Sequence, residues 1–307
     1  MPSIVVVGSV NVDMVIQSEK LPAPGETVTG GTFVLAQGGK GANQAVAANN
    51  LVGGVGLVAK VGKDMFGDQT VQNFAQGGMN VDCVLRDPDK ATGTALILVD
   101  AKGENLISVA PGANFALTPD DIDQAATMIS GAKVLLLQLE IPMETVTRAA
   151  EVASEAGVTV ILDPAPAAPL DRGLLEKVDF ITPNETEATQ ITGVQVIDPE
   201  STRAAAKKLL DMGATQAVIT LGSQGVYWTD GDEELFVPAR KVEACDTTAA
   251  GDAFNGAFGA ALVEGLPIEA ALSRACDVAS LSATKMGAQP SLPTLEEVLE
   301  FERRVFG

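Results

Sequence analysis

The stretch that decides the fold is KVLLLQLEIPMETVTRAAEVASEAGVTVIL, residues 133–162. An apolar run at 133–139 is followed by a helical pattern at 143–156 and by a second apolar run at 158–162. Apolar runs that bracket a helix predict parallel strands buried on both faces. The stretch therefore predicts a strand–helix–strand unit of an α/β fold.

The same alternation continues on both sides of this unit. Further strands are predicted at 178–182 and 217–221, and further helical patterns lie at 119–130 and 202–212. The N-terminal MPSIVVVGSV, residues 1–10, is interpreted as the first strand. The prediction is a doubly wound α/β domain with a mostly parallel, Rossmann-like sheet.

Two early regions depart from this alternation. Residues 26–36 and 92–109 are strand-like, with turns but no intervening helix. They predict a small antiparallel sheet inserted into the α/β unit, and such a sheet beside a ligand crevice is typical of a lid. We expect the α/β domain at 1–11, 40–91 and 111–307, and the lid at 12–39 and 92–110. An exposed sheet edge invites pairing with a second copy, so a homodimer through the lid is expected.

Composition excludes several classes of partner. The chain has 307 residues, 46% of them hydrophobic, and a net charge of −20. A duplex-binding protein needs a positive footprint, and basic residues here form only short pairs. Aromatic residues make up 4% of the chain, too few for a single-strand stacking platform. We therefore expect no nucleic acid and no anionic membrane as partners.

Histidine and cysteine usage narrows the chemistry further. The absence of histidine excludes a Ser-His-Asp triad and any His metal ligand. The cysteines, Cys83, Cys245 and Cys276, are odd in number and widely spaced, which indicates neither a disulfide framework nor a zinc site. The N-terminus lacks a basic signal region and no apolar run reaches spanning length, so we expect a reducing cytoplasm.

Polar residues cluster where the predicted strands end. In open α/β sheets, ligands bind beyond the carboxyl ends of the strands. Five strands deliver polar or glycine-rich groups to that edge: Asn11 and Asp13, Glu140, Asn184 and Glu187, the LGSQG run at 221–225, and Asp252. Their joint placement predicts a shared crevice, although Asp and Asn are also ordinary turn residues.

The stretch QGGKGANQA, residues 37–45, matches neither common nucleotide motif. A P-loop needs Ser or Thr after Gly-Lys, and here Gly41 follows Lys40. The dinucleotide fingerprint also fails, because Gln44 stands where Gly or Ala is expected. The pattern predicts a tight glycine turn that opens a helix at about 41–50, with Asn43 as an amide ligand.

The stretch DTTAAGDAFNG, residues 246–256, places Asp252 among small residues. The plain interpretation is a helix start, since an acid is favoured in a first turn. The more specific interpretation is an anion-binding site. Small residues leave backbone N–H groups unhindered at a helix N-terminus, and such N–H groups bind anions. Helical apolar spacing follows from Phe254 onward, so both interpretations share one helix.

These motifs together resemble a known family. GGKGANQA, GAN (112–114), ITPNETEA, ITLGSQG, DTTAAGDAFNG and KMGAQPS resemble, in order and over nearly the whole chain, the PfkB family of carbohydrate kinases. GGKGANQA and GAQPS are similar to the ribokinases within that family. The resemblance implies transfer of a phosphoryl group from ATP to O5 of D-ribose.

The resemblance also implies roles for individual residues. Asp252 would be the general base, and Ala249, Ala250 and Gly251 would form the anion hole. The ribose site would comprise Asn11, Asp13, Gly39, Lys40, Gly41, Asn43, Glu140 and Asp252. The ATP site would comprise Asn184, Thr220, Leu221, Gly222, Ser223, Gln224, Gly225, Gly251, Asp252 and Cys276.

Metal ions are implied in the same way. Mg²⁺ would accompany ATP, with Glu187 near it through water. K⁺ would act as activator in a loop that comprises Asp246, Thr248, Ser282, Lys285, Gly287 and Ser291. One departure is Cys276, which stands where many ribokinases carry His or Asn, and a thiol makes weaker hydrogen bonds. A small apolar helix residue is the simpler interpretation of Cys276.

Alternative functions follow from the same residues. A kinase of this family could instead act on deoxyribose, fructose, a keto-deoxy sugar acid or a nucleoside, although the low aromatic content disfavours the nucleoside. A sugar-binding regulator would have lost Asp252 or its glycine-rich loop, and both are intact. A nicotinamide oxidoreductase is disfavoured by the failed fingerprint.

Overall fold

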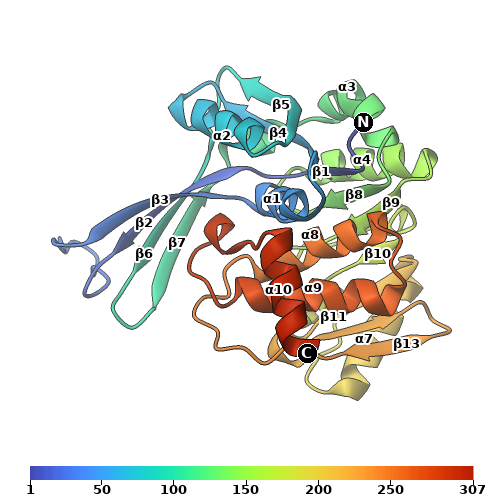
Figure 1. The fold of residues 1–307 in the computed structure, drawn as a ribbon. Helices are drawn as coiled ribbons and strands as arrows, with labels where there is room; N and C mark the ends of the chain where they lie inside the picture. The colour runs from blue at the N-terminus through green and yellow to red at the C-terminus, as the bar shows by residue number, and fades with distance from the viewer. Residues whose placement is uncertain (307) are drawn as a thin grey trace.

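A twisted central sheet forms the middle layer of the computed structural model, which describes residues 1–306 (Figure 1). Within these residues nine strands pair in the order β13-β12-β11-β10-β9-β8-β1-β4-β5. Their bounds are β1 Ile4–Val7, β4 Gly56–Gly62, β5 Asn80–Asp87, β8 Val134–Leu137, β9 Thr159–Leu162, β10 Phe180–Ile181, β11 Gln216–Thr220, β12 Val226–Thr229 and β13 Glu234–Val237. From β5 across to β11 all neighbours are parallel, while β12 and β13 pair antiparallel at one edge.

Helices cover both faces of this sheet. One face packs against α1 Lys40–Val52, α2 Met65–Gln76, α8 Ala250–Val263, α9 Ile268–Ser282 and α10 Leu295–Phe306. The other packs against α3 Pro119–Ser130, α4 Met143–Glu155, α5 Arg172–Leu175, α6 Glu185–Thr192 and α7 Pro199–Met212. In β8, Leu136 belongs to the first core, whereas Leu135 and Leu137 belong to the second. The run of leucines in the sequence thus reflects a strand that is buried on both sides.

The strand–helix–strand unit predicted at 133–162 is confirmed as β8, α4 and β9. The helices expected at 119–130 and 202–212 correspond to α3 and α7, and α7 begins earlier because Pro199 follows an Asp198 cap that binds Ser201 N–H. The strand expected at 178–182 is shorter, with β10 limited to Phe180–Ile181. Among residues 1–306, no helix combines the length and the apolar character needed to cross a membrane.

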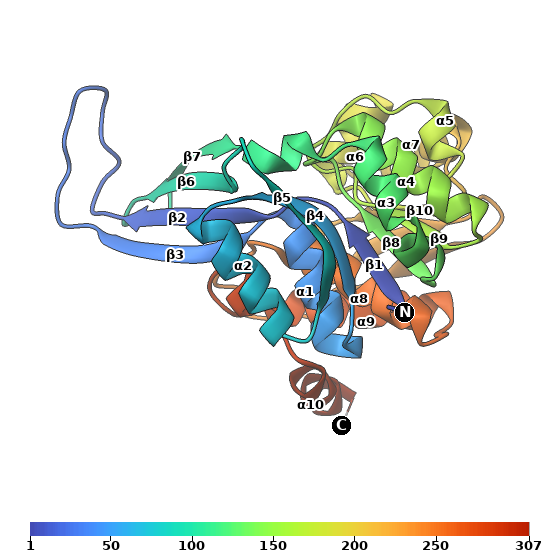
Figure 2. The ribbon, with the colours of Figure 1, turned by 90° about the horizontal axis from the view of Figure 1, so that it is seen from above.

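A second sheet projects from the side of the first (Figures 1 and 2). Its order is β3-β2-β6-β7, with bounds β2 Asn11–Gln17, β3 Thr32–Gly38, β6 Gly93–Val99 and β7 Asn105–Ala110. The separate small sheet is confirmed; it is antiparallel except at the β2–β6 pair, which runs parallel. The division of the chain into two domains stays a prediction.

Residues 26–31 differ from the strand-like expectation, because β3 begins only at Thr32. Gly25 and Gly30 adopt φ values of +83° and +92°, outside the β region. These positive angles turn the chain into a long connection between β2 and β3, which Figure 2 shows at the far end of the small sheet.

The strand order reverses beside β1, which pairs with β4 on one side and with β8 on the other. Ligands of open α/β sheets bind at such switch points, beyond the carboxyl ends of the strands. Asn11, which begins β2, and Glu140, which follows β8, both lie on segments that leave the sheet at this point. The topology therefore places the candidate site at one end of the central sheet, where the small sheet joins it.

Candidate active site

Asp252 lies in the first turn of α8 and is 4% exposed. Its Oδ2 accepts a hydrogen bond of 2.9 Å from Asn43 Nδ2, and its Oδ1 accepts one of 3.2 Å from Gln44 Nε2. Burial raises the pKa of Asp252, while Lys40 and the two amide donors lower it, with a net increase. The result is a buried carboxylate with both oxygens held and with more affinity for a proton than an ordinary Asp.

The turn before Asp252 has an unusual backbone. Ala249 is the N-cap of α8 with φ 61° and ψ 11°, and among residues 1–306 it is the single non-glycine residue at positive φ. An L-residue in this left-handed region costs on the order of 1–2 kcal/mol, and such strain concentrates at functional sites. Gly251 is exposed at the helix start, whereas Ala250 N–H already donates to Thr247 O at 3.1 Å. Of the expected anion hole, the Ala250 donor is therefore partnered within the chain in this structure.

The glycine-rich turn at the start of α1 packs directly on β1's exit. A Cβ at Gly41 would lie 2.6 Å from Gly8 C, and one at Gly39, whose φ is +88°, would lie 2.7 Å from Asn11 N. These contacts explain the glycines, because only bare backbone lets the helix start approach the end of β1 so closely. The expected helix at about 41–50 is α1, which begins one residue earlier at Lys40.

Lys40 carries the positive charge of the site. Its Nζ lies 3.7 Å from Asp163 Oδ2, and its backbone N–H donates to Glu140 Oε2 at 3.1 Å. Burial lowers the pKa of Lys40, but the carboxylates of Asp163, Asp252, Glu140 and Glu187 outweigh it and raise the pKa overall. Lys40 therefore stays charged and balances several acids at once.

Asn43 presents one unsatisfied atom. Its side chain is 6% exposed and its Nδ2 is used by Asp252, but its Oδ1 has no hydrogen-bond partner among the described residues. A buried acceptor without a donor costs on the order of 1–3 kcal/mol, and a bound hydroxyl would relieve that cost. This atom is therefore a candidate ligand-binding group.

The small sheet contributes Asn11 and Asp13 from β2. Asn11 Oδ1 accepts from Asn114 Nδ2 at 2.8 Å, so Asn114, the last residue of the GAN motif, fixes the Asn11 amide. A Cβ at Gly38 would lie 2.3 Å from the Asp13 carboxylate, so that glycine makes room for it. Burial, and then the charge of Glu140, raise the pKa of Asp13 to about 6.

Glu140 follows β8 and is hydrogen-bonded to the segment that follows β1, so it connects the ends of the two strands at the switch point. Its Oε2 accepts a 2.5 Å hydrogen bond from Ser9 Oγ and a 3.1 Å bond from Lys40 N–H. Glu140 is thereby tied to the end of β1 and to the start of α1. The structure brings Asp13, Lys40, Asn43, Glu140 and Asp252 into one electrostatically coupled group, as the electrostatic interactions among their charged members show.

Sequence reasoning missed several members of this group: Ser9, Gln44, Asn114, Gln138 and Asp163. Asp163 follows β9 and is 5% exposed; the strand-end rule that selected Glu140 applies equally to it. Burial raises the pKa of Asp163 to about 7, with Lys40 opposing and the charges of Asp252, Glu187 and Glu140 adding. Gln44 and Gln138 carried no signal beyond their positions in or next to the motifs.

The expected nucleotide side is built from α6 and the turn after β11. Asn184 caps α6 by accepting from Glu187 N–H at 2.9 Å, and Glu187 Oε2 accepts from Asn184 N–H at 2.9 Å. This capping box gives both residues a structural role, yet the charge of Glu187 also acts on Lys40 and Asp163. Thr220 N–H donates to Pro183 O at 3.0 Å, which joins the two segments.

The glycine turn after Thr220 is Gly222–Gln224, with Leu221 before it and Gly225 after it. A Cβ at Gly225, where φ is +112°, would lie 2.0 Å from Val237 O, so this glycine allows a close approach to β13. Gly222, Ser223 and Gln224 are exposed. They are accessible to a ligand.

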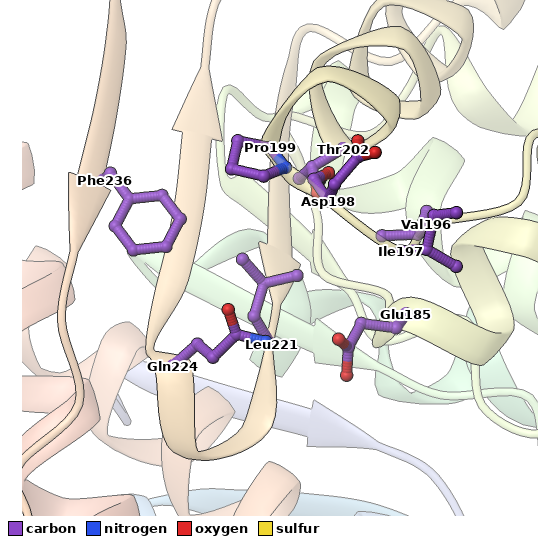
Figure 3. Close-up of a pocket in the computed structure, with 9 residues that line it drawn as sticks. All are labelled: Glu185, Val196, Ile197, Asp198, Pro199, Thr202, Leu221, Gln224 and Phe236. Atoms are coloured by element: carbon purple, nitrogen blue, oxygen red, sulfur yellow. Dashed lines mark hydrogen bonds between the residues drawn. The ribbon is translucent and has the colours of Figure 1, made fainter.

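A small pocket of about 20 Å³ lies on the outer side of this turn (Figure 3). It shares Leu221 and Gln224 with the expected nucleotide residues, and Phe236 and the start of α7 also line it. Its volume suits about one water molecule and is far too small for a nucleotide. This pocket is therefore not the nucleotide site.

Cys276 lies on α9, is 5% exposed and packs within the core between the sheet and its helices. Burial, and then the charge of Asp277, raise the pKa of its thiol to about 12. Its surroundings match the small apolar helix residue that we considered from the sequence. A contact with ATP stays a prediction.

The residues expected to hold a monovalent cation come together. Asp246 Oδ2 accepts from Gly287 N–H at 2.8 Å and its Oδ1 accepts from Thr248 N–H at 2.9 Å. Ser282 and Ser291 are fully buried, and their Oγ atoms lie 2.8 Å apart. Burial raises the pKa of Asp246, but the bonds from Thr248 and Gly287 lower it overall, so this acid stays ionised. Lys285 instead turns to Glu297, 2.5 Å away.

Comparison with known proteins places this fold in a class of sugar-phosphorylating enzymes. A model of the pfkB family of carbohydrate kinases matches residues 1–295, and the chain belongs to this family. It is 42% identical to the ribokinase of Haemophilus influenzae over 97% of this chain and 98% of that protein. It is 41% identical to the deoxyribokinase of Salmonella typhi, again over 97% of this chain and 98% of that protein.

Solved structures give the same result. The Arabidopsis thaliana ribokinase complexed with ribose and ATP superposes with a TM-score of 0.93 at 34% identity, covering 98% of both chains. The α/β class with a mostly parallel sheet and a small extra sheet is therefore confirmed, as is the resemblance on which the residue roles were based.

Proposed function

We propose that this enzyme transfers the γ-phosphoryl group of ATP to O5 of D-ribose, giving D-ribose 5-phosphate. The observation that carries the proposal is the buried Asp252 carboxylate at the start of α8, beside the unsatisfied Asn43 Oδ1. A carboxylate for the sugar proton and a lone acceptor for a sugar hydroxyl stand next to each other. The names of the ribokinase relatives support the same substrate.

In the proposed reaction Asp252 accepts the proton of the O5 hydroxyl. The O5 lone pair then forms a bond to the γ-phosphorus, and the bond from that phosphorus to the bridging β,γ-oxygen breaks, which releases ADP. Phosphoryl transfer asks the protein mainly for positioning and charge stabilisation. Gly251 and Ala249 are proposed to donate backbone N–H groups to the transferring group at the N-terminus of α8, and Ala250 would join them on releasing Thr247 O.

The sugar would bind between the small sheet and the start of α1. Asn11, Asp13 and Asn43 offer hydrogen-bonding side chains, while Gly39 and Gly41 let backbone come close. Lys40 and Glu140 complete the proposed shell, and the positive charge of Lys40 holds the acids around the sugar in place.

The nucleotide would lie along Asn184 and the turn 220–225, with Mg²⁺ bound to its phosphates. Carboxylate oxygens are the ligands that Mg²⁺ prefers, and four carboxylates act on the charge of Lys40, but no three acidic side chains among residues 1–306 are grouped as a metal site. Among them Glu187 is the member on the nucleotide side. When bound, Mg²⁺ neutralises phosphate charge in a chain whose own net charge is −20.

K⁺ is the proposed activator, held by the loop that contains Asp246, Thr248, Ser282, Gly287 and Ser291. The fit rests on Asp246, whose ionised carboxylate cross-links this loop to the segment that leads into Ala249. We expect turnover to depend on K⁺. Equal rates in K⁺ and in a large inert cation such as tetramethylammonium would overturn this part of the proposal.

A homodimer through the small sheet is proposed as the working unit. Large apolar side chains are exposed on that sheet, namely Ile16, Phe33, Val34, Leu35, Leu96, Leu106, Ile107 and Val109. So many exposed apolar side chains on one small sheet favour an interaction site there. Light scattering at micromolar concentration should give twice the chain mass, and a monomer would contradict it.

The unpaired thiols of all three cysteines fit a reducing, cytoplasmic setting.

A second candidate substrate is 2-deoxyribose, favoured by the 41% identity to a deoxyribokinase. The deciding experiment measures kcat/KM for ribose, 2-deoxyribose and fructose with ATP, Mg²⁺ and K⁺, using wild type and Asp252→Asn. Ribose turnover that collapses in the variant supports substrate and base together. A higher kcat/KM for another sugar would replace ribose and leave the mechanism standing.

A further inference from the structure

Gln44 links two buried carboxylates that belong to different parts of the fold. It lies on α1 and is fully buried. Its Nε2 donates to Asp163 Oδ2 at 2.9 Å and to Asp252 Oδ1 at 3.2 Å. An amide nitrogen carries two hydrogens, so both bonds form at once.

The orientation of this amide is fixed by a second one. Gln138, which follows β8 and is also fully buried, donates from Nε2 to Gln44 Oε1 at 2.6 Å. A flipped Gln44 would place its oxygen against the carboxylates and its nitrogen against the Gln138 nitrogen, so only one orientation of Gln44 fits its three partners. Gln138 Oε1 has no hydrogen-bond partner among the described residues. Gly8 makes room for Gln138, because a Cβ there would lie 2.0 Å from Gln138 Oε1.

The elements that carry these groups pack side by side. Figure 1 shows α1 and α8 next to each other over β8, and α1 and α8 are in extensive contact. Asn43, the residue before Gln44, holds the second oxygen of Asp252. The Asp252 carboxylate is thus gripped on both oxygens from one helix, which blocks its rotation.

We propose that Gln44 is a positioning residue for the phosphoryl transfer, which holds Asp252 at a fixed rotation and a fixed separation from Asp163, with Gln138 setting the direction of its amide. This inference rests on the proposed role of Asp252 as base. Gln44 has no exposed surface, so it acts through Asp252 and not on the sugar.

A neutral amide suits this position better than a cation. Two acids close to each other repel, and a shared donor lets both stay buried without neutralising either one. A second cation next to Lys40 would depress the pKa of Asp252 and weaken it as a base. Misplacement of a reacting group by about 1 Å can cost about 100-fold in rate. The hydrogen bonds that fix the Asp252 carboxylate are therefore expected to contribute to kcat.

The test replaces Gln44 by Met, which keeps the volume and removes the donors. We expect kcat to fall about 10- to 100-fold, while KM for ribose and for ATP changes less than about threefold. Asn49→Leu is the matched control on the same helix, since Asn49 donates to Gly77 O away from the site. It should leave kcat unchanged.

A double-mutant cycle separates positioning from general damage. In an Asp252→Asn background, Gln44→Met should lower kcat by less than about threefold, because the group it positions is no longer a base. An equal loss in both backgrounds would overturn the proposal. If Gln44→Met fails to fold, Gln138→Met decides by the same cycle, with an expected loss of about 3- to 10-fold.

The pH profile gives an independent readout. The charged groups that act on Asp252 are Lys40, Glu140 and Asp163, and Asp163 also shares the Gln44 amide with it. Loss of one donor to the ionised carboxylate should move the acidic limb of kcat to higher pH, whereas partial unfolding would lower the amplitude only. An unmoved limb together with unchanged kcat would refute the role of Gln44. Absence of turnover in the wild type would refute the proposed function instead.

Discussion

The two halves of the candidate site are built in opposite ways. On the side of the central sheet, Asp252, Gln44 and Asp163 are buried and bonded to one another across three different elements. On the side of the small sheet, β7 is exposed along its whole length, and β3 is exposed or half-buried up to Gly38. The half on the central sheet is preorganised by its own hydrogen bonds. The half on the small sheet is largely exposed and lacks such support.

This contrast follows the chemistry that each half is asked to perform. A base and its anion hole gain most from fixed positions, because misplacement costs rate directly. A sugar must enter and leave the site, so the small sheet on one side of it has to be free to move. The predictions below test that contrast, beginning with the largest effect.

Replacement of Asp252 by Asn should have the largest effect. We expect kcat for ribose to fall by about 10²–10⁴, the range typical of general-base catalysis. Because the change removes a buried charge whose pKa is raised, the free energy of unfolding should stay equal or increase. Steady-state kinetics and urea unfolding measure the two quantities. Retained kcat would show that Asp252 is not the base.

Asp13→Ala tests the half of the site on the small sheet. Loss of a hydrogen bond to a charged group costs about 1.5–3 kcal/mol, so kcat/KM for ribose should fall about 10- to 150-fold. If Asp13 binds the 2-hydroxyl, the loss on 2-deoxyribose should be far smaller. Asp100→Ala, in the turn between β6 and β7 of the same sheet, is the control and should leave both values unchanged. Equal losses on both sugars would assign Asp13 to another hydroxyl.

The buried acids predict how stability depends on pH. The pKa of Asp13 is raised to about 6 and that of Asp163 to about 7. At pH values between the ordinary pKa of Asp and these raised pKa values, the folded state binds more protons than the unfolded state. The free energy of unfolding therefore falls as the pH rises through this range. The ligand-free enzyme should therefore have a larger free energy of unfolding at pH 5 than at pH 8.

Asp163→Asn provides the comparison for this pH dependence. The variant should lose less stability than the wild type between pH 5 and pH 8, because one of the titrating groups is gone. Urea unfolding at the two pH values measures the difference. A pH dependence equal to that of the wild type would mean that Asp163 is not titrating in this range.

The preorganised half was also the half that sequence reasoning described incompletely. Asp252, Lys40 and Glu140 stood at strand ends or in motifs, and the family resemblance that those motifs carry implied their roles. Gln44, Gln138 and Asp163 become partners only when α1, β8 and β9 pack together, and that contact is a property of the tertiary structure.

The fold itself was more predictable, because its signal is local. Leu135, Leu136 and Leu137 alternate between the two cores, and the unbroken apolar run in the sequence predicts such a strand buried on both faces. The extent of β3 was less predictable, because the positive φ at Gly30 depends on how the connection turns back. Likewise, nothing in the sequence shows that Ala250 N–H is partnered by Thr247 O.

The smallest effect is expected from Ala249→Gly, which loosens the preorganised half without removing a functional group. Ala249 has φ 61°, and glycine adopts this angle without strain. Relief of about 1–2 kcal/mol of strain is partly offset by about 0.4–1 kcal/mol of added chain entropy in the unfolded state. The free energy of unfolding should therefore increase by up to about 1.6 kcal/mol, measured by urea unfolding.

The rate should change in the opposite direction. A freer turn holds the N–H groups of Ala250 and Gly251 less firmly, so kcat should fall a few-fold while KM for ATP stays constant. Gly265→Ala, at φ +79° after the far end of α8, is the reverse control and should lose stability without losing kcat. A stabilised Ala249→Gly enzyme with undiminished kcat would show that the strained turn is not needed for catalysis, and the contrast between the two halves would then rest on the carboxylate cluster alone.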